Sequence, residues 1–301
     1  MVACYRDEPA IREMARRLEA VFEHLGVTWE VIFVNDASPD DAQAVLESEA
    51  ARDRRVKVIT HSRSFGAHSA FTTGLARARG QACVLLDGDL QDPPEVIEQL
   101  YARWREGYDV VYGVRDRRHM SRPAELVYKA FYRVLRAAAP MPVPLDAGSF
   151  SLLDRRVVEA LRAMPERDRF VQGLRAWVGF RQTGVRYERP SRPYGRSTTN
   201  LLWRIRWARK GIFSFSALPV DLLWLAACSL ALAAAVCVAL QIAALLVPSA
   251  PRAGGVLTTL LVVGALQLLA LATIGEYLWR VLEEVKARPH AVVAGEIGFD
   301  D

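Results

Sequence analysis

Two carboxylates separated by a single glycine, Asp87-Gly88-Asp89, are the residues of this 301-residue chain best suited to do chemistry. They directly follow a short apolar run, residues 82–86, that has the composition of a buried strand. In an extended strand alternate side chains point to the same side, so both carboxylates would face one ligand, with Cα atoms about 7 Å apart. Such oxygen donors suit Mg²⁺ or Mn²⁺, which would also hold phosphate oxygens. The alternative is an ordinary polar turn, because Asp-Gly pairs are frequent in turns.

Three further acidic or amide side chains are candidates for a site. Asn35 and Asp36 follow the apolar run 30–34, and no helix cap accounts for them. Asp146 is a lone acid after a proline-rich stretch. It is interpreted either as a catalytic carboxylate or as a turn residue before Gly148, and spacing alone favours the turn.

Two acidic segments are explained without a ligand, as the beginnings of helices. In Asp92-Pro93-Pro94-Glu95, Asp92 is the expected N-cap and Pro93 the first helical residue. Ser38-Pro39-Asp40-Asp41 repeats this pattern. Capping and ligand binding are compatible, so both interpretations of Asp92 stay open.

The elements that must position these residues alternate along the chain. Short runs rich in β-branched residues predict strands, and amphipathic patterns between them predict helices over 10–25, 40–51, 67–78 and 95–106. The predicted strands are 30–34, 56–59, 82–86 and 108–112. Only Val2-Ala3-Cys4 precedes the first helix, so either the first strand is very short or the sequence begins late. The alternation predicts an α/β fold, a mostly parallel sheet covered by helices, that binds ligands at the carboxyl ends of its strands.

The last third of the chain has a different composition. Residues 222–247 and 253–275 form two runs without a charged side chain, and Arg252 lies between them. At about 1.5 Å per residue each run is long enough to cross a hydrocarbon core of about 30 Å. We therefore predict two transmembrane helices, about 220–247 and 253–277, within a segment 220–280. The alternative is a pair of buried core helices.

Charge distribution predicts how such a hairpin would be oriented. Residues 1–210 carry a net formal charge of +8, and the rest of the chain carries −3. Basic residues flank both apolar runs on the outside of the pair. By the positive-inside rule this places the α/β domain, 1–195, and a tail, 281–301, in the cytoplasm. Residues 196–219 interleave aromatic and basic side chains, as an interfacial amphipathic helix does. The expected location is the inner cell membrane, and no nucleic-acid-binding module is found.

An ordered series of motifs resembles the family 2 glycosyltransferases. It comprises Cys4-Tyr5-Arg6-Asp7-Glu8, Phe33-Val34-Asn35-Asp36-Ala37-Ser38, Ser62-Arg63-Ser64-Phe65-Gly66, Asp87-Gly88-Asp89-Leu90-Gln91-Asp92-Pro93-Pro94 and Tyr112-Gly113-Val114-Arg115. Leu145-Asp146-Ala147-Gly148-Ser149-Phe150, Arg167-Asp168-Arg169-Phe170 and the segments 177–185 and 275–286 resemble the polyisoprenyl-phosphate subgroup, which includes bactoprenol glucosyltransferase and dolichol-phosphate mannose synthase. The resemblance covers nearly the whole chain.

The resemblance implies a GT-A fold that transfers a sugar, with inversion, from a nucleotide-diphosphate sugar to a polyprenyl phosphate, UDP-glucose being the favoured donor. It implies catalytic roles for Asp146 and Asp89, and Mg²⁺ or Mn²⁺ on Asp87 and Asp89. The donor-binding residues that it implies are Tyr5, Asp7, Glu8, Asn35, Asp36, Gly66, Asp87, Gly88, Gln91 and Asp92. Arginines suit an acceptor phosphate, and the candidates are Arg115, Arg118, Arg122 and Arg196.

The chain departs from the family pattern at Asn35, at Ser64 and at Thr198-Thr199, which leaves the nucleobase and the hold on the acceptor phosphate open. Two other functions are weighed. A membrane-tethered nucleotidyltransferase would be expected to have a glycine-rich phosphate loop with a nearby lysine near its N-terminus, yet Lys57 is the first lysine. A non-catalytic membrane scaffold would bind nucleotide sugar without turnover. The sequence is also compatible with a homo-oligomer.

Overall fold

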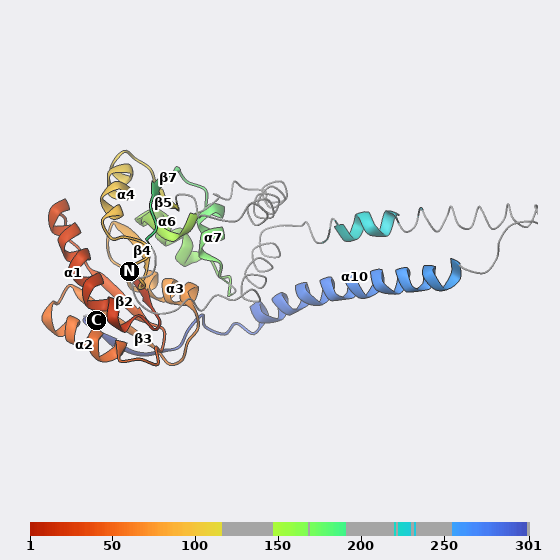
Figure 1. The fold of residues 1–301 in the computed structure, drawn as a ribbon, viewed down its shortest axis with the longest axis horizontal. Helices are drawn as coiled ribbons and strands as arrows, with labels where there is room; N and C mark the ends of the chain where they lie inside the picture. Colours follow the sequence, from red (N-terminus) through yellow and green to blue (C-terminus); the bar gives the residue numbers. More distant parts are fainter. Residues whose placement is uncertain are drawn as a thin grey trace, which may run out of the picture.

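The computed structural model describes residues 1–115, 147–167, 169–190, 220, 222–229, 232 and 255–299. Within these ranges the chain forms an α/β domain, from which one long helix extends away (Figure 1). The first predicted spanning segment and the amphipathic segment 196–219 lie almost entirely outside the described residues. Of the first, residues 222–229 are helical.

The first half of the domain alternates strands and helices, as predicted. In chain order these are β1 (Val2–Cys4), α1 (Glu8–Leu25), β2 (Val31–Asn35), α2 (Ala42–Arg52), β3 (Val56–His61), α3 (Ala67–Arg77), β4 (Ala82–Asp87), α4 (Val96–Arg105) and β5 (Val110–Arg115). The three residues of β1 are all buried.

The second half contains β6 (Ala147–Asp154), α6 (Arg155–Ala163), α7 (Val171–Trp177), β7 (Gln182–Tyr187), α10 (Gly255–Val285) and β8 (Val293–Ile297). The strands join one eight-stranded sheet in the order β7-β5-β6-β4-β1-β2-β3-β8. Only β6 and β8, among the strands described, run antiparallel to their neighbours. The predicted mostly parallel sheet flanked by helices is confirmed.

Both faces of the sheet are covered, because its strands alternate core residues from one side to the other. Phe33 packs with α1, α2 and α4, whereas its neighbours Ile32 and Val34 pack with α3, α6 and α7. The same alternation places Leu86 on the α1 side and Leu85 on the α3 side. Burial on both faces explains why the strands are nearly continuous apolar runs in the sequence.

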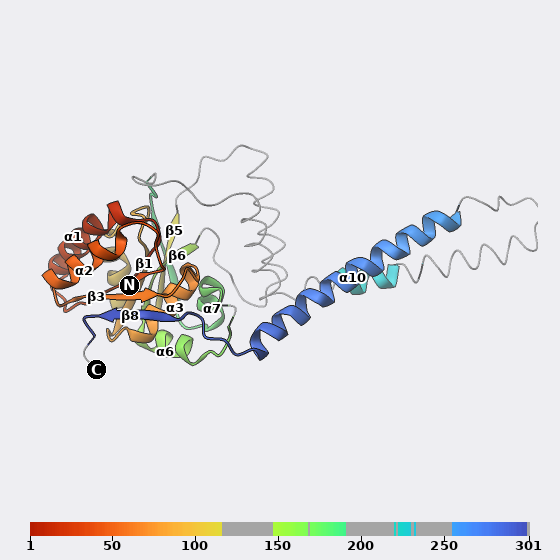
Figure 2. The same ribbon diagram turned by 90° about the horizontal axis from the view of Figure 1, so that it is seen from below.

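The long helix α10 covers most of the second charge-free run and ends beyond it. Figures 1 and 2 show it leaving the domain as a single rod. The predicted boundary at residue 281 falls inside this helix. No helix in the described ranges combines the length and the apolar character needed to cross a bilayer.

Residues after α10 return to the domain instead of forming a free tail. Strand β8 pairs with β3 at the sheet edge, with Ile59 opposite Glu296 (Figure 2). Glu296 also forms an ion pair with Arg77 of α3. At the end of α10, both carboxylate oxygens of Glu284 accept from the backbone N–H of Arg167, at 2.8 and 3.0 Å. The last turn of α10 is thus joined to the domain through Glu284, and the segment after the helix is joined separately through β8.

Gly113 provides a test of the packing near the carboxyl end of β5. A Cβ at this position would lie 2.7 Å from the Tyr187 ring and 3.0 Å from the Phe150 ring. These two rings pack edge to face. We expect Gly113→Ala to lower the free energy of unfolding by about 1–3 kcal/mol in urea denaturation, because rigid rings must shift. The matched control is Gly295→Ala in β8, where a Cβ meets nothing within 4 Å; a similar loss there would contradict the packing argument.

Candidate active site

The carboxyl ends of β1, β2 and β4 meet at one edge of the sheet. Cys4 pairs with Asn35, and Ala3 pairs with Asp87. Backbone hydrogen bonds continue past the strand ends, from Gly88 N to Ala3 O at 2.8 Å and from Asp36 N to Cys4 O at 3.0 Å. The structure therefore brings together the three segments that the sequence analysis nominated separately.

Gly88 allows the close approach of these segments. A Cβ at this position would lie 3.0 Å from Ala3 O and from the Cys4 Sγ, and 3.1 Å from an Asp7 carboxylate oxygen. Asp7 itself is buried, and the same oxygen accepts a hydrogen bond from Tyr5 N. Glycine is needed because the backbone of β1 and the Asp7 carboxylate fill the space that a side chain would occupy.

The electrostatics of the β4 tip are dominated by clustered negative charge. Burial, and then the neighbouring carboxylates of Asp92 and Asp89, raise the pKa of Asp87 to about 7. A hydrogen bond from the Ser149 hydroxyl at 3.1 Å and the charge of Arg115 act in the opposite direction without cancelling the effect. Asp89 is buried, and one of its oxygens accepts from Gln91 N at 3.1 Å.

Asp87 and Asp89 fit a divalent cation, since a cation would offset both the burial and the neighbouring negative charges that raise the pKa of Asp87. In the part of the chain that is described, no group of three or more His, Cys, Asp or Glu side chains could enclose a metal ion. The described protein ligands would thus be these two carboxylates. This suits Mg²⁺, which commonly binds one or two carboxylates and takes its other ligands from phosphate and water.

Asp92 does not cap α4, contrary to the expectation from the sequence. The helix begins at Val96, after a turn through Pro93 and Pro94. The Asp92 side chain is completely buried and accepts hydrogen bonds from the Tyr187 hydroxyl and from Arg189 Nε, the latter at 3.0 Å. Contacts with β7, far along the chain, outweigh the local capping signal.

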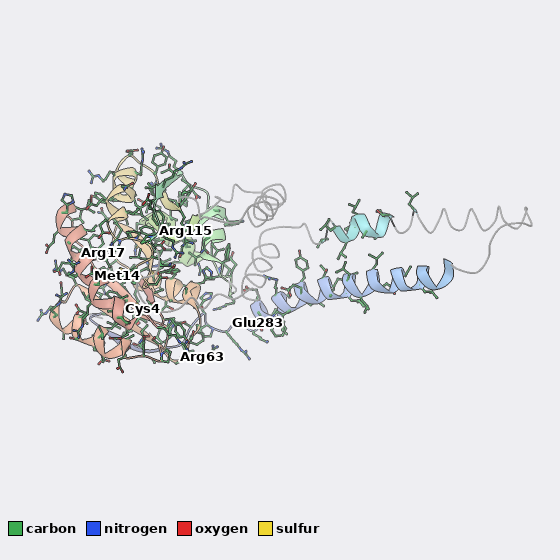
Figure 3. All side chains as sticks on the ribbon, in the orientation of Figure 1. Cys4, Met14, Arg17, Arg63, Arg115 and Glu283 are labelled. Carbon is green, nitrogen blue, oxygen red and sulfur yellow. The ribbon has the colours of Figure 1, made fainter. Side chains whose placement is uncertain are left out.

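Arg115 joins this network at the end of β5. Its guanidinium lies 3.6 Å from Asp92 and donates from Nε to the Tyr187 hydroxyl at 3.4 Å. Burial disfavours its charge, but Asp92 and then Tyr187 hold the pKa of Arg115 above its usual range. Burial, followed by Asp92, also raises the pKa of Tyr187. In Figure 3, Arg115 lies on the side of the domain toward α10, and Arg17 lies on the far side.

Asp36 is bound by the loop that follows β3. Its two oxygens accept from His61 Nδ1 at 2.7 Å and from three donors of the motif 62–66, each at 2.8 Å: Ser64 Oγ, Phe65 N and Gly66 N. Burial would raise the pKa of Asp36, yet these hydrogen bonds, led by that of His61, lower it below its usual range. The carboxylate orders the loop and has its acceptor positions largely filled.

The remaining predicted donor-binding residues lie around the same edge. The Asn35 side chain is bound internally, to Ser38 N and to Gln43. Tyr5 is half-exposed, and Glu8 begins α1 with its N–H bound to Asp40. Asp146, Arg118, Arg122 and Arg196 lie outside the described residues.

Sequence reasoning missed the partners that hold these groups in place, namely His61, Ser64, Ser149, Tyr187 and Arg189. Ser64 and Ser149 stand inside quoted motifs, but nothing in the motif shows that a serine donates to a particular carboxylate. Tyr187 and Arg189 carry no local signal, since their partner Asp92 is 95 and 97 residues away in the sequence.

Asp36→Asn tests the role of Asp36 in ordering the loop. The amide keeps the side-chain shape but turns one acceptor into a donor, which would face N–H or O–H groups. We expect a loss of about 2–3 kcal/mol in the free energy of unfolding at pH 7. Because the folded pKa of Asp36 is depressed, its contribution is present above the unfolded value, about 3.9, and is lost as pH falls through the folded value. The stability difference between wild type and variant should therefore shrink in acid.

The control is Asp41→Asn, at an exposed carboxylate that makes no side-chain cap to α2. Its unfolding free energy should stay within about 0.5 kcal/mol of wild type. An Asp36→Asn protein as stable as this control would contradict the assignment.

Comparison with known proteins places the chain among enzymes. Residues 1–162 match the sequence profile described as glycosyl transferase family 2. An uncharacterized glycosyltransferase of Synechocystis sp. is 39% identical over 100% of this chain and 95% of its own length. The prophage-derived bactoprenol glucosyl transferase of Shigella flexneri is 32% identical over 97% of this chain and 96% of its own, and a prophage bactoprenol glucosyl transferase homolog of Escherichia coli is 30% identical over 97% of each. The chain therefore belongs to glycosyl transferase family 2, and it is a glycosyltransferase.

Proposed function

We propose that the enzyme transfers a sugar from a nucleotide-diphosphate sugar, UDP-glucose in the favoured form, to the phosphate of a polyprenyl phosphate such as undecaprenyl phosphate. The observation that carries the proposal is the meeting of Asp87, Asp89 and Arg115 at the tips of β4 and β5, which provides acidic and basic groups for two phosphate-bearing substrates. Near-full-length similarity to proteins named bactoprenol glucosyl transferase supports the lipid acceptor.

The order of the strand tips supports one direction for the donor. Asn35 and the loop held by Asp36 lie at the tips of β2 and β3, and the two carboxylates lie at the tip of β4, across β1. A nucleotide laid along this edge puts its base near the loop and its diphosphate near Asp87. Its sugar then lies toward β6 and β5, where Arg115 stands.

The chemistry requires little activation of the nucleophile. A lipid phosphate has a second pKa near 6, so much of it is dianionic at neutral pH. A phosphate oxygen attacks the anomeric carbon while the bond from that carbon to the donor diphosphate breaks, which inverts the configuration. A divalent cation bound by Asp87 and Asp89 supplies charge neutralisation for the departing diphosphate.

The protein's own groups position the reactants. Arg115 offers a guanidinium that suits a phosphate, and Arg118, Arg122 and Arg196 are further candidates from the sequence. Asp146 would orient the acceptor or stabilise the positive charge that develops on the sugar ring. It immediately precedes β6, whose Ser149 contacts Asp87.

A polyprenyl acceptor requires a membrane, and the membrane assignment rests on the sequence. The charge-free runs 222–247 and 253–275 support a hairpin, and the basic residues at its outer ends support a cytoplasmic catalytic domain in the inner membrane. In the view of Figure 3, Arg115 lies toward the end of the domain from which α10 extends.

Transfer itself is tested with purified protein in detergent, radiolabelled UDP- and GDP-sugars and undecaprenyl phosphate. We expect a chloroform-soluble labelled product from wild type with UDP-glucose. Asp89→Ala should reduce its rate at least about 100-fold, equivalent to about 2.7 kcal/mol of transition-state stabilisation. Asp41→Ala, at an exposed carboxylate, should leave the rate unchanged. Donor binding without product would instead indicate a scaffold. Release of labelled sugar 1-phosphate, which is the leaving group when the nucleoside monophosphate is transferred, would indicate a nucleotidyltransferase.

Metal binding is tested by thermal unfolding in the presence of Mn²⁺ and UDP. A ligand at 100 times its dissociation constant adds about 2.7 kcal/mol of stability. For a protein of this size the corresponding rise in Tm is about 5–10 °C. EDTA should abolish the rise, and Asp87→Asn should reduce it to less than half, each protein being compared with its own metal-free state. An undiminished rise in Asp87→Asn would refute the assignment of this ligand.

A further inference from the structure

Arg175 of α7 is a buried cation that the proposed reaction has not used. Its side chain is 1% exposed, and its guanidinium lies over the Tyr112 ring, 5.1 Å from the ring centroid. Nη1 donates to the backbone oxygen of Gly148 at 3.1 Å. Neither Nε nor Nη2 has a hydrogen-bond partner among the residues described.

Stability does not explain an arginine at this position. Enclosing a guanidinium with two nitrogens that lack hydrogen-bond partners among the residues described is unfavourable, and an apolar side chain of similar length would pack in the same space without that cost. Burial lowers the pKa of Arg175 to about 10, which reflects the same penalty. Among the residues described, Arg175 donates to the Gly148 carbonyl, and this hydrogen bond is what an arginine adds at the position.

Gly148 is held from a second direction by Arg115. A Cβ at residue 148 would lie 2.5 Å from Arg115 Nη2, so the guanidinium packs directly on the glycine backbone. The guanidinium groups of two arginines from different elements, β5 and α7, thus lie against the same residue at the start of β6, and that of Arg175 is hydrogen-bonded to it. The backbone of α7 is in turn tied to β7, because Gln182 Nε2 donates to the Arg175 carbonyl at 3.0 Å.

The fixed residue connects directly to the reacting groups. Ser149, the next residue, donates to Asp87, and both side chains lie on the face of the sheet that α7 covers. On the other side of Gly148, only Ala147 separates it from Asp146 in the sequence. A shift of Gly148 would therefore move a partner of the proposed metal ligand and the attachment of the proposed catalytic acid.

We propose that Arg175 is a positioning residue that holds the start of β6 in register with the β4 carboxylates. It acts through Gly148 on the geometry of transfer and leaves the binding of either substrate to other groups. This inference rests on the proposed function for its kinetic consequence, but its structural consequence, an ordered segment 147–151, is independent of that function.

The experiment compares Arg175→Met, Arg175→Lys and the exposed control Arg12→Met on α1 in the full-length protein in detergent. For Arg175→Met we expect kcat to fall about 10- to 100-fold, with KM for donor and for polyprenyl phosphate within twofold of wild type and Tm unchanged or raised. Arg175→Lys, which keeps a charged donor, should recover kcat to within about fivefold of wild type. Arg12→Met should match wild type.

Hydrogen–deuterium exchange of the same proteins provides a readout that needs no turnover. Exchange in Arg175→Met should be faster in peptides covering 147–151 and unchanged in β1 to β3. If wild type makes no lipid-linked sugar from any donor, the proposed function fails while this measurement still tests the positioning role.

Three results would overturn the inference. A tenfold rise in KM for the acceptor, with kcat retained, would make Arg175 a binding residue. Unchanged kinetics and exchange would remove any role in positioning. A fall in Tm with faster exchange throughout the domain would make it a general structural residue.

Discussion

The feature on which the site depends is the concentration of negative charge at the tip of β4. Asp87, Asp89 and Asp92 lie within six residues, and the latter two are buried. Burial, and then repulsion by Asp92 and Asp89, raises the pKa of Asp87. The charge of one of the three is compensated within the protein. Asp92 accepts hydrogen bonds from Tyr187 and Arg189 and forms an ion pair with Arg115. Asp87 and Asp89, two oxygen-donor side chains separated by one glycine at the tip of β4, are the pair suited to a divalent ion.

Contacts on both faces of the sheet hold this edge in place. On the face covered by α1, α2 and α4, the Tyr187 ring packs on Gly113 and its hydroxyl reaches Asp92. On the opposite face, Ser149 reaches Asp87 and Arg175 reaches Gly148. The antiparallel strand β6 lies between β4 and β5 and so receives contacts from both sides. Inserting β6 there brings residues from the second half of the chain into a site begun by the first half.

Much of this arrangement could be predicted from the sequence, because its signals are local. The positions of the strands were predicted from short apolar runs. Asp87 and Asp89 were recognisable as candidates because they directly follow such a run. The features that the sequence analysis missed depend on contacts between residues far apart in the chain. Asp92 carries a convincing capping pattern, yet its partner Tyr187 is distant in the chain and outweighs it. Strand β8 was not predicted for a similar reason. It has only five residues, and nothing in their pattern shows that they pair with β3 at the edge of the sheet. The predicted hairpin and the positions of Asp146, Arg118, Arg122 and Arg196 stay predictions.

The contacts of β8 bear on how the domain is oriented toward a bilayer. A catalytic domain joined to a membrane helix by one flexible linker would sample many orientations, and an acceptor headgroup would meet the site only in some of them. Here the end of α10 is fixed at Arg167 through Glu284, and the chain then crosses to β3 and is held again at Arg77 through Glu296. Two attachments separated along the domain restrict rotation about either one. If the hairpin proposed from the sequence enters a membrane, this restraint limits the orientations that the tips of β4 and β5 can take toward the headgroups. The entropy cost of orienting the site is then met during folding and not in each encounter with the lipid.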